Sequence, residues 1–223
     1  SVSLGFAHTC SILDDGNLKC WGNSGSGQLG IDSYTNANIP QSVHLGVGRT
    51  AVSVSLGESH TCAILDDASL NCWGRNAEGQ LGITGYNGET SPTTVPLAGN
   101  STPVSIILAH SSTCAILSDT SLKCWGQNDY YIFNSDSTSV QIPEKIGIKI
   151  KSSVEQISAG GYHNCLIDFN SNLRCMGAGS NGRLGIGFTD NNINQPLIVN
   201  LGIGRTAVSV SLGGYHTCAI LDD

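Results

Sequence analysis

Hydrophobic and polar residues alternate along short segments of this chain, and the alternation returns every fifty-odd residues. In the segment AVSVSLG, residues 51–57, the apolar residues Val52, Val54 and Leu56 alternate with serines. A period of two is typical of a β-strand with one buried face. We therefore expect Val52, Val54 and Leu56 to lie on the buried face of a strand.

Two further strands follow in the same repeat. The segments HTCAILD, residues 60–66, and SLNCWG, residues 69–74, are separated by a tight turn around residues 66–68. In the first repeat this turn ends in Gly16, and a three-residue loop of this kind is typical of a hairpin with a bulge. With a fourth strand expected at residues 41–45, the fold class is all-β, built of propeller-type blades of four short antiparallel strands.

The chain divides into four repeats of about 52 residues and the start of a fifth. We place the boundaries at residues 1–52, 53–104, 105–155 for a divergent third copy, 156–208, and a partial fifth copy at 209–223. Residues 201–223 match residues 45–67 at 20 of 23 positions. We expect a segment of a longer array, which either completes a larger closed propeller or continues as an open stack of repeats.

Nine cysteines follow the period of the repeat. In the first hairpin, pairing residues whose numbers sum to 30 sets Cys10 opposite Cys20 and Ile12 opposite Leu18, all on one face. Opposed cysteines at such a position are close enough for a disulfide bond. The same spacing of nine intervening residues recurs, and we predict four disulfides within the hairpins: Cys10–Cys20, Cys62–Cys72, Cys114–Cys124 and Cys165–Cys175.

The ninth cysteine, Cys218, has no partner at this spacing within the chain. Its partner is expected ten positions later, beyond Asp223, so we interpret Cys218 as unpaired by truncation. Zinc sites usually place paired ligands two to four residues apart, which disfavours a metal here. Disulfides instead indicate an oxidising compartment, and we expect an extracellular or cell-surface location.

Several spaced motifs carry a resemblance to a known family. The first repeat contains His8-Thr9, Leu18, Trp21-Gly22-Asn23 and the turn Gly27-Gln28-Leu29-Gly30, and the second repeat matches it closely. The chain resembles the repeats of the regulator of chromosome condensation family, over its whole length. The resemblance implies a β-propeller, usually of seven blades. The cysteine pairs resemble those of a secreted subgroup of such repeats.

The third and fourth repeats depart from this pattern. The third has Ser112 in place of histidine and NDYYIFNS in place of the GQLG turn, whereas the fourth has Met176 in place of tryptophan and Arg183 in place of glutamine. We expect these blades to pack less regularly. Tyr130, Tyr131 and Phe133 of the third repeat are candidates for an interface, since exposed aromatic residues favour protein contacts. An equal alternative is a local cluster that fills the space of the missing turn.

The polar residues that recur along the chain are candidates for catalytic or metal-binding groups, but residues spaced at the repeat period do not converge on one site. The histidines His8, His60, His163 and His216 occur once in every repeat except the third, and we interpret them as structural residues that join one strand to a neighbouring loop. The paired aspartates at the hairpins are expected to form turns through bonds to the local backbone. We therefore predict no catalytic residues, no metal site and no cofactor. Asn100 begins the sequon NST and is a candidate for an N-linked glycan.

The charge and the apolar content of the chain limit the kinds of partner that it can bind. Charged residues make up 12% of the chain, the formal net charge is −7, and no apolar run reaches membrane-spanning length. An acidic chain has no broad basic surface for nucleic acid, so we expect neither nucleic-acid binding nor membrane insertion. The predicted function is a non-catalytic extracellular structural or scaffolding protein that self-associates, for instance in a filament or surface assembly. The alternative is a secreted binding module of the adhesin or protein-inhibitor type that binds another extracellular protein.

Overall fold

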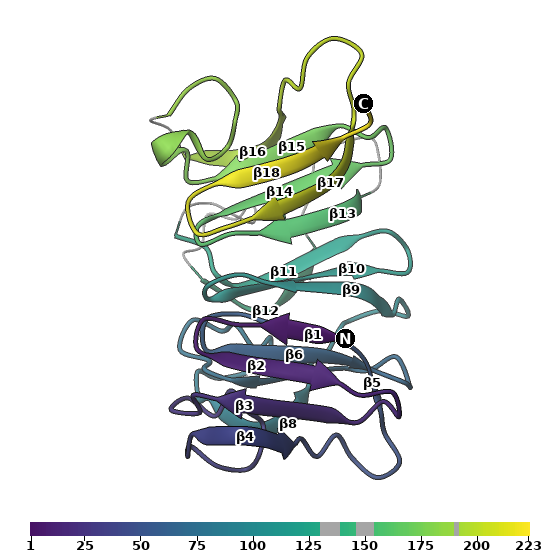
Figure 1. Ribbon diagram of the computed structural model, residues 1–223, viewed down its shortest axis with the longest axis vertical. Coiled ribbons are helices and arrows are strands. Elements are labelled where there is room, and N and C mark those ends of the chain that lie inside the picture. Colours follow the sequence, from purple (N-terminus) through teal and green to yellow (C-terminus); the bar gives the residue numbers. More distant parts are fainter. Residues whose placement is uncertain (130–138, 146–153, 190–191) are drawn as a thin grey trace. The chain divides into compact units, whose positions relative to one another are not determined.

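The protein is built from short antiparallel β-strands (Figure 1). The computed structural model describes residues 1–129, 139–145, 154–189 and 192–223. Within these ranges the one helical element is a single 3₁₀ turn, η1 (Ser180–Gly182). No helix in the described ranges has the length and apolar character needed to cross a bilayer. The chain divides into two compact units, and each is described by itself.

Unit 1 comprises residues 1–119, 123–127 and 139–144 and contains three four-stranded sheets, whose strands follow one another in sequence order. The first sheet consists of β1 (Val2–Leu4), β2 (His8–Ile12), β3 (Leu18–Gly22) and β4 (Ala37–Ser42). The second consists of β5 (Ala51–Leu56), β6 (His60–Leu65), β7 (Leu70–Gly74) and β8 (Glu89–Thr94). The third consists of β9 (Pro103–Leu108), β10 (Ser112–Leu117), β11 (Leu122–Gln127) and β12 (Ser139–Lys145).

Unit 2 comprises residues 145–223 together with the stretches 120–122 and 128–138. Its four-stranded sheet consists of β13 (Val154–Ala159), β14 (His163–Asp168), β15 (Leu173–Gly177) and β16 (Ile193–Ile198). A two-stranded sheet follows, formed by β17 (Ala207–Leu212) and β18 (Thr217–Leu221). The expected blades of four antiparallel strands are therefore present in both units, including the divergent repeats. The repeat boundaries remain a prediction.

The register of the central hairpins is the one predicted from the sequence. In β2 and β3, Cys10 lies opposite Cys20 and Ile12 lies opposite Leu18. The structure places all four cysteine pairs at disulfide-bond distance, with S–S separations of 1.96 to 2.08 Å. Both sulfur atoms of a pair lie on one face because directly opposed residues of an antiparallel pair point the same way. Each bridge therefore ties the two middle strands of a blade together.

The alternation predicted for β5 is wrong at one position. Val52 is 65% exposed, although Leu56 is buried as expected and Val54 is partly buried. The register shifts between Ala51 and Ser53 where β5 pairs with β6, which marks a bulge. A bulge adds one residue to a strand, so the side chains before it switch faces. Ala51 consequently takes the buried position that the simple alternation assigned to Val52.

The aspartate pairs form the hairpin turns, as predicted. Asp15 Oδ1 accepts a hydrogen bond from the backbone N–H of Asn17 at 3.0 Å, and Asp67 Oδ1 accepts one from Ser69 at the same distance. The side-chain and backbone bonds from Ser69 hold the pKa of the Asp67 carboxyl below its usual value. Gly16 has φ +78°, in the left-handed region that this turn requires.

Candidate functional site

The repeated histidines join neighbouring blades within each unit. His8 Nε2 lies 2.8 Å from Thr61 Oγ1 of the next repeat, and His60 Nε2 lies 2.9 Å from Thr113 Oγ1. In unit 2, His163 Nε2 lies 2.9 Å from Thr217 Oγ1. These three histidines have structural contacts, as expected, but the partner of each ring is a strand threonine of the following repeat and not a neighbouring loop.

The threonine and a tryptophan share one backbone oxygen of the preceding repeat. Thr61 Oγ1 donates to the carbonyl oxygen of Gln28 at 2.8 Å, and Trp73 Nε1 donates to the same oxygen at 3.0 Å. Because the single hydroxyl hydrogen of Thr61 points to Gln28, the hydrogen of the His8–Thr61 bond belongs to His8 Nε2. The HT, WG and GQLG motifs are therefore parts of one hydrogen-bonded link between blades.

The same link recurs at the next blade and, in part, in unit 2. Thr113 Oγ1 and Trp125 Nε1 both donate to the carbonyl oxygen of Gln80, at 2.8 and 3.0 Å. In unit 2, Thr217 Oγ1 donates to the carbonyl oxygen of Arg183 at 2.7 Å. A backbone carbonyl does not depend on its side chain, so arginine can replace glutamine at this position without loss of the link.

Burial keeps these histidines neutral. It lowers the pKa of His60 to about 3, and that of His8 and His163 to about 4. The Nδ1 atom of each of the three rings is buried without a hydrogen-bond partner. Over the described ranges, His, Cys, Asp and Glu form no group of three or more that could hold a metal ion. The absence of catalysis, metal and cofactor remains a prediction.

A glycine three residues before each linking histidine makes room for its ring. A Cβ atom built on Gly57 would lie 2.5 Å from His60 Nδ1 and 2.6 Å from the carbonyl oxygen of Ala109. The third repeat has Ala109 at the glycine position and Ser112 at the histidine position, and its backbone bond from Ala109 N–H to Ser112 O matches that from Gly57 to His60. Alanine is thus present where the ring is absent.

We expect Gly57→Ala to lower the free energy of unfolding by about 1–3 kcal/mol, because the added methyl group overpacks a buried site. Adding His60→Ser removes the clash with the ring but not the one with Ala109. The loss of unfolding free energy in the double variant is therefore expected to be smaller than the sum of the two single losses by about 0.5 kcal/mol or more. Urea denaturation measures these values. Gly25→Ala is the control, since its Cβ would meet only one side-chain oxygen at 3.5 Å; additive effects would contradict the coupling.

The other residues singled out from the sequence lie apart from this link. Cys218 is exposed and is not one of the paired cysteines. Asn100 is exposed in the connection between β8 and β9, and its glycosylation remains a prediction. The candidate interface residues Tyr130, Tyr131 and Phe133 lie outside the described residues.

A pocket in unit 1 contains aromatic residues that the sequence reasoning missed. Tyr34 and Tyr86 occupy equivalent positions in the β3–β4 and β7–β8 connections and are 61% and 55% exposed. Together with Arg75 and Asn76 they line a pocket of about 360 Å³. The sequence does contain a signal that the two tyrosines occupy equivalent positions, because they lie 52 residues apart, at the repeat period. We call Tyr34, Tyr86, Arg75 and Asn76 the tyrosine pocket.

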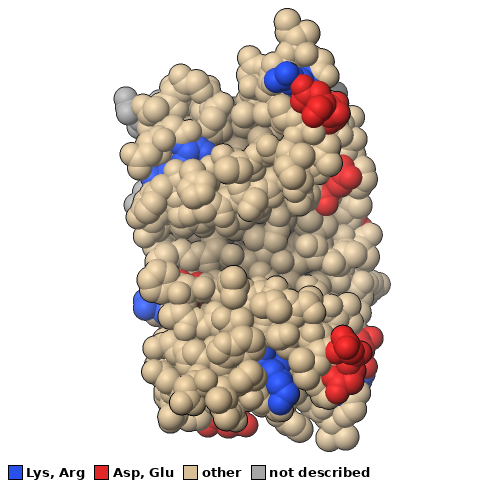
Figure 2. Space-filling model, viewed as in Figure 1, with Lys and Arg blue, Asp and Glu red and all other residues tan. Residues whose placement is uncertain are grey.

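The tyrosine pocket has the chemistry of a protein-binding site. Arg75 Nη2 lies 3.7 Å from Glu78 Oε1, and both side chains are well exposed, so this ion pair contributes little and the guanidinium can bind another carboxylate. Tyrosine and arginine are, with tryptophan, the residues enriched at binding hot spots. On the face drawn in Figure 2 the described acidic and basic side chains form small separate groups, with no continuous basic patch.

Comparison with models of protein families shows to which family the chain belongs. Two models, both described as the regulator of chromosome condensation (RCC1) repeat, match residues 1–28, 51–80 and 154–183, and residues 15–64 and 175–220. The chain belongs to the RCC1 repeat family. The resemblance noted in the motifs is confirmed, and the link between blades is built from the residues of this repeat.

Curated relatives and solved structures agree with this assignment. The ultraviolet-B receptor UVR8 of Arabidopsis thaliana is 26% identical over 99% of this chain and 50% of its own length. The probable E3 ubiquitin-protein ligase HERC4 of Rattus norvegicus is 28% identical over 85% of the chain and 18% of the ligase. Yeast RCC1 (Prp20) bound to Kap60 has a TM-score of 0.86 at 20% identity, over 98% of this chain and 53% of that one. The RCC1 repeat chain thus spans about half or less of the length of each of these proteins and has the RCC1 propeller fold.

Proposed function

We propose that this RCC1 repeat chain is a non-catalytic propeller module that binds another protein. The observation that carries the proposal is the tyrosine pocket, where two exposed aromatic rings and an exposed arginine lie together on one unit. Two similarities support it. Yeast RCC1 is seen bound to Kap60, and the structure of Prp20p from Saccharomyces cerevisiae is described with its binding to Gsp1p and histones.

We place this module outside the cell or at its surface. The support is the set of four cysteine pairs at bonding distance, since such bonds persist in oxidising compartments and are rare in the cytosol. The scattered charges in Figure 2 and the net charge of −7 favour a protein partner over nucleic acid. The structural or scaffolding role in a filament remains a prediction, and electron microscopy of the purified chain tests it.

The tyrosine pocket can be tested with peptides selected from a displayed random library on the immobilised protein. Replacing Tyr34 and Tyr86 together by alanine is expected to weaken the best of these peptides at least tenfold, because truncating a hot-spot residue costs about 2 kcal/mol or more. Surface plasmon resonance measures the affinity. Phe169→Ala is the matched control, since Phe169 is 57% exposed but lies in the β14–β15 turn. Equal affinity for the double variant and the native protein would contradict the proposed site.

A further inference from the structure

The tyrosine pocket of unit 1 offers groups that are free to contact a ligand. The side chains of Tyr34 and Tyr86 are both more than half exposed, and neither hydroxyl makes a hydrogen bond to another described residue. Among the described residues that line the pocket, Arg75 is the one that carries a charge, and its contact with Glu78 is long, at 3.7 Å. The pocket thus combines two aromatic faces, two hydroxyls that can donate hydrogen bonds, and one positive charge.

A buried polar side chain holds each tyrosine loop in place. In the β3–β4 connection, Ser24 Oγ donates a hydrogen bond to the carbonyl oxygen of Ser33 at 2.9 Å. In the β7–β8 connection, Asn76 Nδ2 donates one to the carbonyl oxygen of Gly85, also at 2.9 Å. Ser33 and Gly85 directly precede the two tyrosines, and Ser24 and Asn76 are 0% and 1% exposed. The backbone that carries each ring is therefore ordered before a ligand binds, which lowers the entropic cost of binding.

Two further bonds hold the loop of Tyr34 against the second blade. The backbone N–H of Asp32 donates to the carbonyl oxygen of Thr90 at 3.0 Å, and Ser91 Oγ donates to Asp32 Oδ1 at 2.6 Å. Thr90 and Ser91 belong to β8, in the blade that also carries Tyr86. The two rings thus come from different blades but are fixed relative to each other, and such a pocket suits a ligand that is itself stiff.

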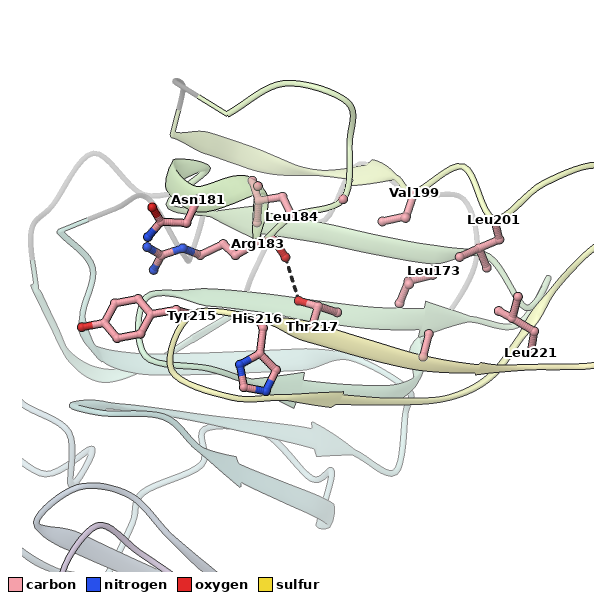
Figure 3. A pocket seen from close by; sticks show the side chains of 13 residues that line it. Leu173, Asn181, Arg183, Leu184, Val199, Leu201, Tyr215, His216, Thr217 and Leu221 are labelled. Atoms are coloured by element: carbon pink, nitrogen blue, oxygen red, sulfur yellow. Dashed lines mark hydrogen bonds between the residues drawn. The ribbon is translucent and has the colours of Figure 1, made fainter.

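The lining of the pocket disfavours two common ways of binding a peptide. The lining residues all lie in connections between strands, so the pocket presents no strand edge to which an extended peptide could add. A groove for an amphipathic helix needs an apolar wall. The pocket of unit 2 drawn in Figure 3 has such a wall of leucine and valine side chains, whereas Ala77 is the one aliphatic residue in the described lining of the tyrosine pocket.

A polyproline II segment matches the free groups of the tyrosine pocket. Its backbone makes no internal hydrogen bonds, so its carbonyl oxygens can accept hydrogen bonds from the two tyrosine hydroxyls. Proline-rich segments dock on aromatic residues, and proline fixes its own φ, so little backbone entropy is lost on binding. A carboxylate beside the prolines can pair with Arg75, since a guanidinium binds a carboxylate through two parallel hydrogen bonds.

We propose that the tyrosine pocket binds a proline-rich, acidic segment of its partner protein in the polyproline II conformation. The proline rings lie against Tyr34 and Tyr86, and the tyrosine hydroxyls donate to carbonyl oxygens of the segment. Arg75 binds a glutamate or aspartate that flanks the prolines. This inference rests on the proposed role of the pocket as a protein-binding site and adds the chemistry of the partner.

The test uses a fluorescein-labelled hexaproline peptide with a glutamate at each end, so that neither chain direction is assumed. Fluorescence anisotropy measures its affinity for the purified protein. A peptide of equal length in which glycine and serine replace the prolines is expected to bind more weakly by about tenfold or more, because its backbone must be ordered on binding. Equal affinity of the two peptides would overturn the proposal.

A second comparison tests the carboxylate. Replacing both glutamates of the peptide by glutamine is expected to weaken binding about threefold, the size of a solvent-exposed ion pair. The protein variant Arg75→Gln is expected to abolish this difference. Arg49→Gln is the matched control, since the Arg49 side chain is 42% exposed, against 46% for Arg75, but does not line the pocket. Circular dichroism shows whether each variant is folded, and a difference that persists in Arg75→Gln would overturn the proposed pairing.

The peptides selected from the random library distinguish a failure of this inference from a failure of the proposed function. If they need Tyr34 and Tyr86 but the hexaproline peptide does not bind, the polyproline inference is wrong and the protein-binding role stands. If they bind the double tyrosine variant and the native protein with equal affinity, the proposed function itself is wrong. Binding of the neutral sugar cellotetraose without binding of the hexaproline peptide would identify a carbohydrate site and would also overturn the inference.

Discussion

Replacing Trp73 by alanine is expected to lower the free energy of unfolding of unit 1 by about 3–5 kcal/mol, the usual cost of truncating a buried tryptophan. The side chain is fully buried, packs on Gly30 and donates a hydrogen bond to the Gln28 carbonyl oxygen. All three tryptophans of the chain lie in unit 1, so the fluorescence of the remaining two follows the urea denaturation of this unit alone.

A matched control for this change is Trp21→Ala. Trp21 occupies the same position in the first repeat but is only partly buried, so its truncation is expected to cost clearly less. Trp73→Phe separates the two contributions, because it keeps an aromatic ring and removes the donor, while Thr61 still satisfies the Gln28 oxygen. A loss at Trp73 no larger than that at Trp21 would show that the link between blades contributes little to stability.

Lowering the pH from 7 to 5 is expected to destabilise the protein by about 2 kcal/mol for each linking histidine. The unfolded histidine binds a proton near pH 6.5, whereas burial lowers the pKa of His8 and His163 to about 4 and that of His60 to about 3. Below pH 6.5 the unfolded state therefore binds more protons, and stability falls until the pH reaches the folded pKa. One pKa unit corresponds to about 1.4 kcal/mol, which gives the stated size.

Urea denaturation at several pH values above 5 measures this effect before ordinary carboxyl groups titrate. The variant His60→Ser, which has the serine that the third repeat carries naturally, is expected to reduce the dependence on pH by about one histidine's share. His44→Ser is the control, because His44 is exposed in the connection between β4 and β5. An unchanged pH dependence in His60→Ser would mean that this ring is not held neutral in the folded protein.

Much of the blade could be predicted from local patterns. The pairing of Cys10 with Cys20 followed from spacing and strand parity, since a hairpin register depends only on residues close in sequence. The position of Val52 could not be predicted, because a bulge depends on how two strands adjust to each other and the alternation does not encode it. Strand existence was therefore predicted better than the orientation of individual side chains.

The contacts of the histidines were harder to predict than their structural role. The period showed that His8 and Thr61 recur, but not that they meet, because the bond joins residues 53 positions apart. The meeting of Thr61 and Trp73 at one carbonyl oxygen depends on how two blades stack, which only the three-dimensional structure contains. Tyr34 and Tyr86 lie in irregular connections between strands, where neither strand alternation nor hairpin parity indicates which side chains meet.

The link through one shared carbonyl oxygen constrains how such repeats diverge over evolutionary time. Each link takes its histidine and its turn from one repeat and its threonine and tryptophan from the next. A duplication that copies whole repeats reproduces every link, but a later substitution removes a partner from a residue in the neighbouring copy. In this chain Ser112 and the missing GQLG turn of the third repeat accompany Asn164 and Met176 of the fourth. The residues of one link thus belong to a junction between two successive repeats and not to a single repeat.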